Sequence, residues 1–257
     1  MPTILAADTG TAINTVALCR VDADAARLEI LCETIAACGR LHAERLLETA
    51  QWALDQAGMT LDTVDALAVT TGPGSFTGVR IGVATWKGLA LGADKPLIGV
   101  SSLDALASQI TPAAIGDPII VCPILDARMG EVFGAAYEYT VQGRRLLRPP
   151  AACSVETLFT GLEGLVVAGG DAVRLYRDRI AACAPNIAFA PDWLATPRAA
   201  AVAAEAAHTL RAGNLPDADS VDVLYLRKSQ AETSRDQRLA AGRSEEHTSE
   251  LQSHLNL

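Results

Sequence analysis

The stretch TTGPGSFTGVRIG, residues 70–82, decides how the rest of the sequence is interpreted. It carries four glycines and lies between an apolar run, residues 66–69, and a helix-like run, residues 79–93. Glycine-rich turns that open a helix often bind phosphate, because backbone N–H groups and the helix dipole favour an anion. The stretch matches neither G-x-x-x-x-G-K-[ST] nor G-x-G-x-x-G, the two common phosphate-binding patterns. Phosphate binding and helix packing therefore both have to be considered.

Small residues recur along the helix-like run. Gly78 and Gly82, and then Gly88 and Gly92, stand four positions apart. That spacing places small residues on one face of a helix, where another element can approach closely. The pattern favours a packing surface over a catalytic loop.

Strand-like and helix-like segments alternate along the chain, which predicts an α/β fold. In the first half we expect strands at 3–7, 14–21, 28–36, 66–71 and 97–100, with helices at 41–57, 79–93 and 103–109. In the second half we expect strands at 119–125, 131–139, 165–168 and 187–190, with helices at 155–162, 172–183 and 199–212. The similar order predicts two related domains, 1–110 and 111–232, with the last segment free to pack back on the first.

Several polar turns follow the predicted strands and are candidates for a nucleotide site. Asp8 and Asp126 each end an apolar strand at equivalent places in the two halves. An aspartate and backbone N–H groups in such turns can hold magnesium and phosphate. The same residues also make ordinary tight turns and helix caps, and the short motifs do not decide between these roles. The candidates are Asp8, Thr9, Gly10, Thr11, Asp126, Gly169 and Gly170.

The composition limits the chemistry that can be proposed. The chain has 257 residues and a formal net charge of −9, which argues against a broad electrostatic contact with nucleic acid. Six cysteines without a C-x-x-C pair favour free thiols in a reducing cytoplasm. No signal peptide or long apolar span is evident, so we expect a cytoplasmic protein without a membrane segment.

The end of the chain looks like a translated sequencing adaptor. Residues 243–257 contain RSEEHTSELQSH, and we expect their removal to leave stability and partner binding unchanged. Two of the four histidines lie there, which leaves His42 and His208. Ser75 is the most exposed-looking hydroxyl, but no histidine is near it in the sequence, so a nucleophile–base pair is not evident.

The motifs together resemble the TsaB (YeaZ) family over residues 2–232. The resemblance rests on GPGSFTGVRIG and the ATWKGLALGADKPLIGVSSLDALA that follows it, with DTGTAINTVAL, LHAERLLETAQWAL, LDARMGEVFGAAYE and YLRKSQAE elsewhere. It implies the actin-like ATPase (ASKHA) fold and a role in making threonylcarbamoyladenosine on tRNA. One departure is Gly10, where the family more usually has serine.

The resemblance also implies a subunit without its own catalysis. TsaD, a relative that transfers threonylcarbamoyl to tRNA, holds a metal with two histidines in a V-N-H-x-x-A-H pattern. Ser102 and Leu106 stand at those positions here, and a leucine cannot bind a metal. We therefore expect no metal and no cofactor, while weak ATP or ADP binding stays open.

The family's partners are TsaD and TsaE, with tRNA reached through the complex and a homodimer when the protein is alone. The resemblance places the partner surface on the helices 41–57 and 79–93. We expect Leu46→Glu or Ala84→Glu to abolish TsaD binding while the monomer stays folded. The expected partner-binding residues are Leu46, Leu47, Ala50, Ala53, Arg80, Ile81, Ala84 and Gly88.

Two other classes of function are alternatives to a non-catalytic subunit. The first is an active ATP-dependent phosphotransferase of the same fold, favoured by Asp8, Asp126 and Gly169-Gly170. Against it, Ala127-Arg128 follows Asp126, where kinases of this fold usually keep a glycine for the phosphate. The second is a peptidase, for which the sequence offers no nucleophile–base pair or metal site.

Overall fold

The computed structural model describes residues 1–21, 28–37, 39, 42–111, 118–213 and 215–227. All the helices and strands of this part lie in one compact unit, Met1–Leu226. None of the helices in the described ranges is both long enough and apolar enough to cross a membrane.

The first sheet has five strands in the order β3-β2-β1-β4-β5. They are β1 (Thr3–Asp8), β2 (Ile13–Val21), β3 (Leu28–Ala37), β4 (Ala66–Gly72) and β5 (Leu97–Ser101). The antiparallel hairpin of β1 with β2 sits beside the parallel pairs β1–β4 and β4–β5. All residues of β1 are buried, because helices cover both faces of the sheet, and this explains its unbroken apolar run.

The second sheet repeats the same arrangement, with the order β10-β9-β6-β7-β8. Its strands are β6 (Ile119–Arg128), β7 (Glu131–Thr140), β8 (Gly143–Cys153), β9 (Leu165–Gly169) and β10 (Ile187–Phe189). The predicted segments missed β8. This strand lies at the edge of its sheet and carries three arginines and two prolines, which an edge strand tolerates.

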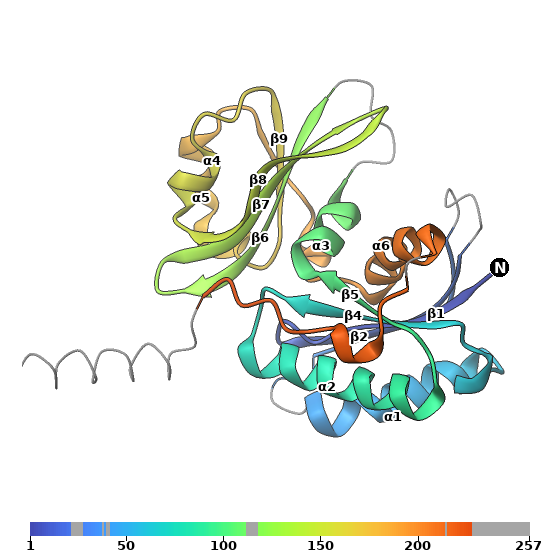
Figure 1. Cartoon of the computed structure of the whole chain (residues 1–257). Coiled ribbons are helices and arrows are strands. Elements are labelled where there is room, and N and C mark those ends of the chain that lie inside the picture. The colour runs from blue at the N-terminus through green and yellow to red at the C-terminus, as the bar shows by residue number, and fades with distance from the viewer. Residues whose placement is uncertain (22–27, 38, 40–41, 112–117, 214, 228–257) are drawn as a thin grey trace, which may run out of the picture. The chain divides into compact units, whose positions relative to one another are not determined.

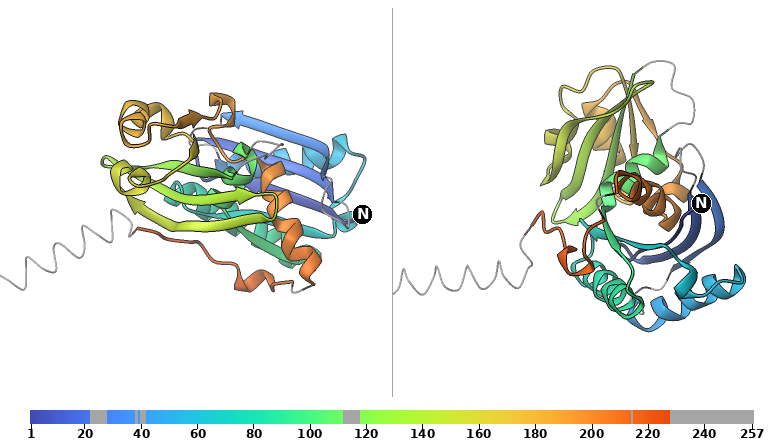
Figure 2. Two further views of the ribbon diagram at one scale, coloured as in Figure 1. Left: turned by 90° about the horizontal axis from the view of Figure 1, so that it is seen from above. Right: turned by 45° about the vertical axis from the view of Figure 1, so that its right-hand side comes forward.

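Helices α1 (His42–Gln56) and α2 (Phe76–Ala93) cover one face of the first sheet. The opposite face packs against α6 (Ala199–Ala212), which follows the second sheet in the chain but returns to the first. Helix α3 (Ser102–Ile110) packs on the second sheet and also contacts α6. Helices α4 (Val155–Phe159) and α5 (Val173–Cys183) cover the other face of the second sheet. Figures 1 and 2 show α3 and α6 between the two sheets.

The two halves have one element order, three strands followed by helix, strand, helix, strand and helix. Together with the shared strand order, this is the duplicated unit of the actin-like ATPase fold, so the predicted fold class is confirmed. Short 3-10 turns at Leu61–Thr63, Asp192–Leu194 and Ala218–Ser220 complete the described secondary structure. The division at residues 110 and 111 stays a prediction.

Candidate functional site

The glycine-rich stretch packs closely against the turn between β1 and β2 and forms hydrogen bonds with it. The amide of Ser75 donates to the carbonyl of Gly10 (2.6 Å), and the Thr9 hydroxyl donates to the carbonyl of Gly78 (2.7 Å). Ser75 caps α2 by accepting a hydrogen bond from the Gly78 amide (3.3 Å). Two amides at the start of α2, those of Ser75 and Gly78, therefore bind protein oxygens.

The glycines of the stretch are explained by this contact. A Cβ atom at Gly78 would collide with the carbonyl oxygen of Thr9, and one at Gly82 would collide with the Thr9 hydroxyl. A Cβ at Gly74 would lie 2.5 Å from the carbonyl oxygen of Gly10. Only glycine lets α2 come this close to the β1–β2 turn. The geometry agrees with the helix-packing role of the stretch.

Asp8, at the end of β1, is a fully buried carboxylate. Its Oδ1 accepts a hydrogen bond from the Thr70 hydroxyl (2.6 Å), whereas Oδ2 has no partner among the described residues. The pKa of Asp8 is raised to about 7, mainly by burial and to a smaller extent by Asp171, although hydrogen bonds from Thr70 and the Gly10 backbone act in the opposite direction. Asp8 thus titrates near neutral pH.

Asp171 comes from the other sheet and was not among the predicted site residues. It follows β9, and its Oδ1 accepts a hydrogen bond from the amide of Asp126 (2.9 Å). Burial raises the pKa of Asp171, and the neighbouring Asp126 carboxylate adds to this. Asp171 therefore interacts electrostatically with Asp8 of the first half and with Asp126 of its own half.

The other predicted nucleotide residues mostly contact the protein itself. The Asp126 carboxylate accepts a hydrogen bond from the backbone amide of Arg128 (2.9 Å) and forms an ion pair with the Arg128 guanidinium (3.5 Å). Thr11 makes a local turn with the amide of Ile13 (3.1 Å). A side chain at Gly169 would meet Ile110 and Ala190, and one at Gly170 would collide with the backbone of Ile124. Their assignment to a nucleotide stays a prediction.

Ser102 and Leu106, which the resemblance matches to the metal ligands of TsaD, are both buried in α3. Leu106 packs in an apolar cluster with Leu103 of the same helix and with Val121 and Leu125 of β6. Ser102 is fully buried, and its hydroxyl has no hydrogen-bond partner among the described residues. In the part of the chain that the structure describes, no group of three or more histidine, cysteine or acidic side chains is placed to hold a metal ion.

The sequence comparisons point in one direction. Residues 34–239 match the model of a family described as TsaD, tRNA N6-adenosine threonylcarbamoyltransferase. The chain is 41% identical over 140 residues to the tRNA threonylcarbamoyladenosine biosynthesis protein TsaB of Escherichia coli, covering 54% of this chain. It is 43% identical over 94 residues to TsaB of Haemophilus influenzae, covering 37% of this chain. The matches span 57% and 39% of the length of these two relatives.

A solved structure extends the likeness to the whole fold. YeaZ from Pseudomonas aeruginosa superimposes with a TM-score of 0.73 at 30% identity, covering 88% of this chain and all of that one. The chain belongs to the TsaB (YeaZ) family. The resemblance read from the glycine-rich stretch is thereby confirmed.

The structure corrects part of the partner surface expected for a TsaB-family protein. Leu46 and Ala53 are fully buried and Ala50 is nearly so, all against the first sheet. They form the core of the monomer and are not available to a partner, so we now expect Leu46→Glu to unfold the monomer, because it would bury an unpaired charge. Leu47, the adjacent partner-binding candidate, is 50% exposed, so the helix turns Leu46 inward and Leu47 toward the surface.

The remaining predicted partner residues lie on or near the surface of α1 and α2. Arg80, Ala84 and Gly88 are exposed, and Ile81 is partly buried against the first core. Trp52 and Leu91, which the sequence analysis did not single out, are 50% and 56% exposed. Large exposed apolar side chains on the outer faces of α1 and α2 could have marked this surface once the inward face was known.

Proposed function

We propose that this chain is a non-catalytic subunit in the biosynthesis of threonylcarbamoyladenosine on tRNA, with TsaD and TsaE as partners. The observation that carries the proposal is the contact between the glycine-rich stretch and the β1–β2 turn. The amides of Ser75 and Gly78 donate to protein oxygens, so these two groups at the start of α2 are not available to a phosphate. The names of the E. coli and H. influenzae relatives supply the process.

The buried positions of α3 support the absence of TsaD-type catalysis. Leu106 contributes to an apolar core where TsaD would need an imidazole, and Ser102 offers only a hydroxyl. On this basis we propose that the chain has no catalytic metal and no cofactor, and that TsaD supplies the transfer chemistry and the contact with tRNA. The exposed faces of α1 and α2 would meet TsaD, or a second copy when the chain is alone, in the cytoplasm.

An ATP-dependent phosphotransferase is the second candidate. Asp8 and Asp171 come from opposite sheets and interact electrostatically, as the acidic groups of a nucleotide site would. Against it, Arg128 binds Asp126, and Ile110 fills the space beside Gly169. The two proposals differ in what the isolated chain can do.

Reconstitution tests both. The chain is mixed with TsaD and TsaE of the same organism, a threonylcarbamoyl donor, ATP and unmodified tRNA, and modified adenosine is measured by mass spectrometry. We expect modification by the complete mixture, little without the chain, and none by the chain alone. ATP turnover or phosphoryl transfer by the isolated chain would favour the phosphotransferase, and full modification without the chain would contradict the subunit role.

A further inference from the structure

The last described segment of the chain packs along α2 as a strap, residues 217–226. Ala218 and Val221 are buried in the core beneath α2. The amide of Leu224 donates to the carbonyl of Thr71 (2.7 Å), and Lys87 of α2 donates to the carbonyl of Asp219 (3.1 Å). The strap runs beside α2 toward the helix N-terminus (Figure 1) and so brings Tyr225 there.

Tyr225 and Phe76 clamp the side chain of Arg80. The Arg80 Nε donates a hydrogen bond to the Tyr225 hydroxyl (2.6 Å), and the guanidinium carbon lies 3.8 Å from the centre of the Phe76 ring. The two aromatic rings also contact each other, with 5.2 Å between their centres. Stacking on a ring and a fixed Nε bond hold a planar guanidinium in one orientation.

The clamp uses only one side of the Arg80 guanidinium. Within the described ranges, no carboxylate oxygen lies at ion-pair distance from Arg80, and its two terminal nitrogens donate no hydrogen bond. The side chain is exposed and carries an uncompensated positive charge on a protein whose net charge is −9. A pair of terminal N–H groups presented in this way matches the two oxygens of a carboxylate.

We propose that Arg80 is a receptor for a carboxylate of a partner protein, and that Phe76 and the strap residue Tyr225 position it. The proposal rests on the subunit role given above, in which that partner is TsaD. Arg80 begins a row of exposed residues on α2 that continues through Ala84, Gly88 and Leu91, at helical spacing. The receptor thus sits at one end of a flat surface.

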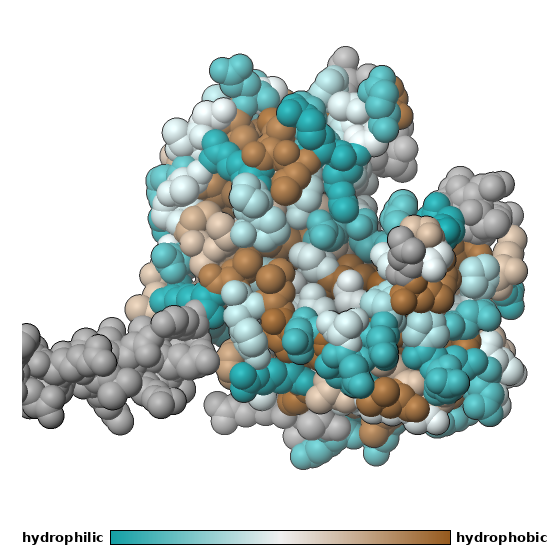
Figure 3. Space-filling model, in the orientation of Figure 1, coloured by the Kyte–Doolittle hydropathy of each residue, from teal (hydrophilic) through white to brown (hydrophobic). Residues whose placement is uncertain are grey.

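The surroundings favour a protein carboxylate over an RNA phosphate. Nucleic acid is bound by several cations that act together, whereas the neighbours of Arg80 along this row are small or apolar. The nearest lysine of α2, Lys87, already contacts the strap at Asp219 and Asp222. Figure 3 shows hydrophobic residues interspersed with hydrophilic ones on the lobe that carries α2, and a mixed surface of this kind is common in protein interfaces.

The test measures the affinity of the full chain for TsaD by calorimetry at two salt concentrations. We expect Arg80→Gln to weaken binding roughly 30-fold or more and to reduce its salt dependence, because a desolvated ion pair loses one partner. Arg80→Lys should restore part of the affinity, since it keeps the charge without the planar fork. The matched control is Arg177→Gln in α5, which removes an exposed arginine whose guanidinium carbon lies 4.1 Å from the centre of the Phe189 ring. This control should change the affinity less than about twofold, because Arg177 lies outside the α2 surface.

A double-mutant cycle separates positioning from folding. Tyr225→Phe should weaken binding several-fold in the wild-type background and have no further effect in the Arg80→Gln background. Equal binding by wild type and Arg80→Gln, both folded by circular dichroism, would overturn the inference and leave the subunit role intact. No binding by wild type would overturn both. Loss of tRNA binding by Arg80→Gln with unchanged TsaD affinity would assign the arginine to phosphate instead.

Discussion

Asp8 shows how one buried side chain links the two halves of the fold. Its Oδ2 lacks a hydrogen-bond partner among the described residues, and Asp171 of the other half lies close enough to raise its pKa. A carboxylate in this position costs free energy when ionised, and the cost is relieved by a proton. The folded protein therefore holds a proton on Asp8 at a pH where the unfolded chain does not.

Asp8 makes the folded protein less stable as the pH rises. The pKa of Asp8 rises from 3.8 to about 7 on folding, so the folded state binds more protons than the unfolded state between these values. Asp8 thus lowers the free energy of unfolding as pH increases from about 4 to 7, by roughly 4 kcal/mol in total. We expect Asp8→Asn to remove this decline, so that chemical denaturation shows the variant gaining stability relative to wild type between pH 5 and 8.

Thr70→Val provides a second variant for the same measurement. The Thr70 hydroxyl donates a hydrogen bond to Asp8 and thereby lowers the pKa of Asp8. The substitution removes this hydroxyl, keeps the size of the side chain and so should raise the pKa of Asp8. The decline in stability should then continue to higher pH than in wild type. A stability difference between Asp8→Asn and wild type that stays constant with pH would show that Asp8 is ionised throughout.

Helix α1 illustrates where sequence periodicity is ambiguous. Leu46 and Leu47 are adjacent, and the apolar residues that follow at 50, 53, 54 and 57 fit either one as the inward position. In the structure Leu46 is fully buried, and Leu47 is 50% exposed. Leu46 therefore contributes to the core of the protein, whereas Leu47 lies at its surface.

Alanine substitutions in α1 test this difference. Leu46→Ala should lower the free energy of unfolding by about 2–5 kcal/mol, because it leaves a cavity under the helix. Leu47→Ala should cost less than about 1 kcal/mol, because half of its side chain is already in water. Urea denaturation of both variants measures the two values, and similar losses in both would contradict the orientation of α1.

The elements that follow from local pattern were predicted well, and those that depend on tertiary contacts were not. The strands of the first half and the helix at 199–212 were expected within a few residues, because their apolar runs are continuous. Strand β8 was missed because an edge strand needs no regular apolar alternation. Tyr225 and Asp171 gain their roles only from Arg80 and Asp8, which lie 145 and 163 positions away along the chain. No pattern in the local sequence identifies residues that interact over such separations along the chain.

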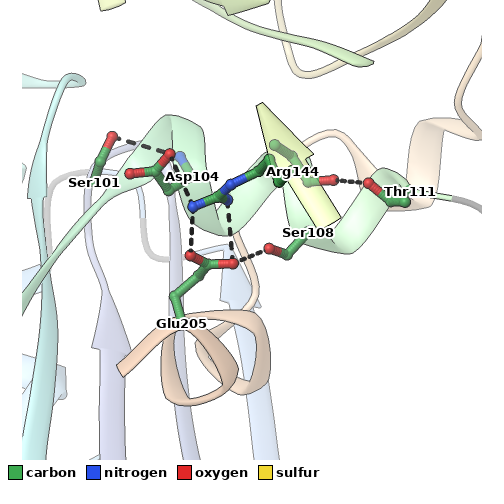
Figure 4. A network of polar contacts seen from close by, with 7 residues as sticks. Ser101, Asp104, Ser108, Thr111, Arg144 and Glu205 are labelled. Atoms are coloured by element: carbon green, nitrogen blue, oxygen red, sulfur yellow. Dashed lines mark hydrogen bonds and ion pairs between the residues drawn. The ribbon is translucent and has the colours of Figure 1, made fainter. Parts of the chain in front are cut away.

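An ion-pair network joins the two sheets through their covering elements. Arg144 of β8 binds Glu205 of α6 (3.1 Å) and Asp104 of α3 (3.7 Å), and Ser108 donates to the same glutamate (Figure 4). Burial would lower the pKa of Arg144, but Glu205, Tyr139 and Asp104 outweigh it and raise the pKa. Because α6 packs on the first sheet and β8 belongs to the second, the network fixes one sheet relative to the other.

A pair of double-mutant cycles measures this connection. Arg145, the next residue in β8, forms an ion pair with Glu138 on the same sheet, and its side chain is 68% exposed compared with 30% for Arg144. We expect the Arg144→Gln and Glu205→Gln cycle to give a coupling free energy of about 1–3 kcal/mol, because Glu205 is only 14% exposed and loses a charged partner. The Arg145→Gln and Glu138→Gln cycle should give about 1 kcal/mol or less, as exposed pairs do. Hydrogen exchange adds a structural readout, since Arg144→Gln should increase exchange in α6 and Arg145→Gln should not. Equal coupling in the two cycles, with α6 unaffected, would mean that apolar packing alone holds the sheets together.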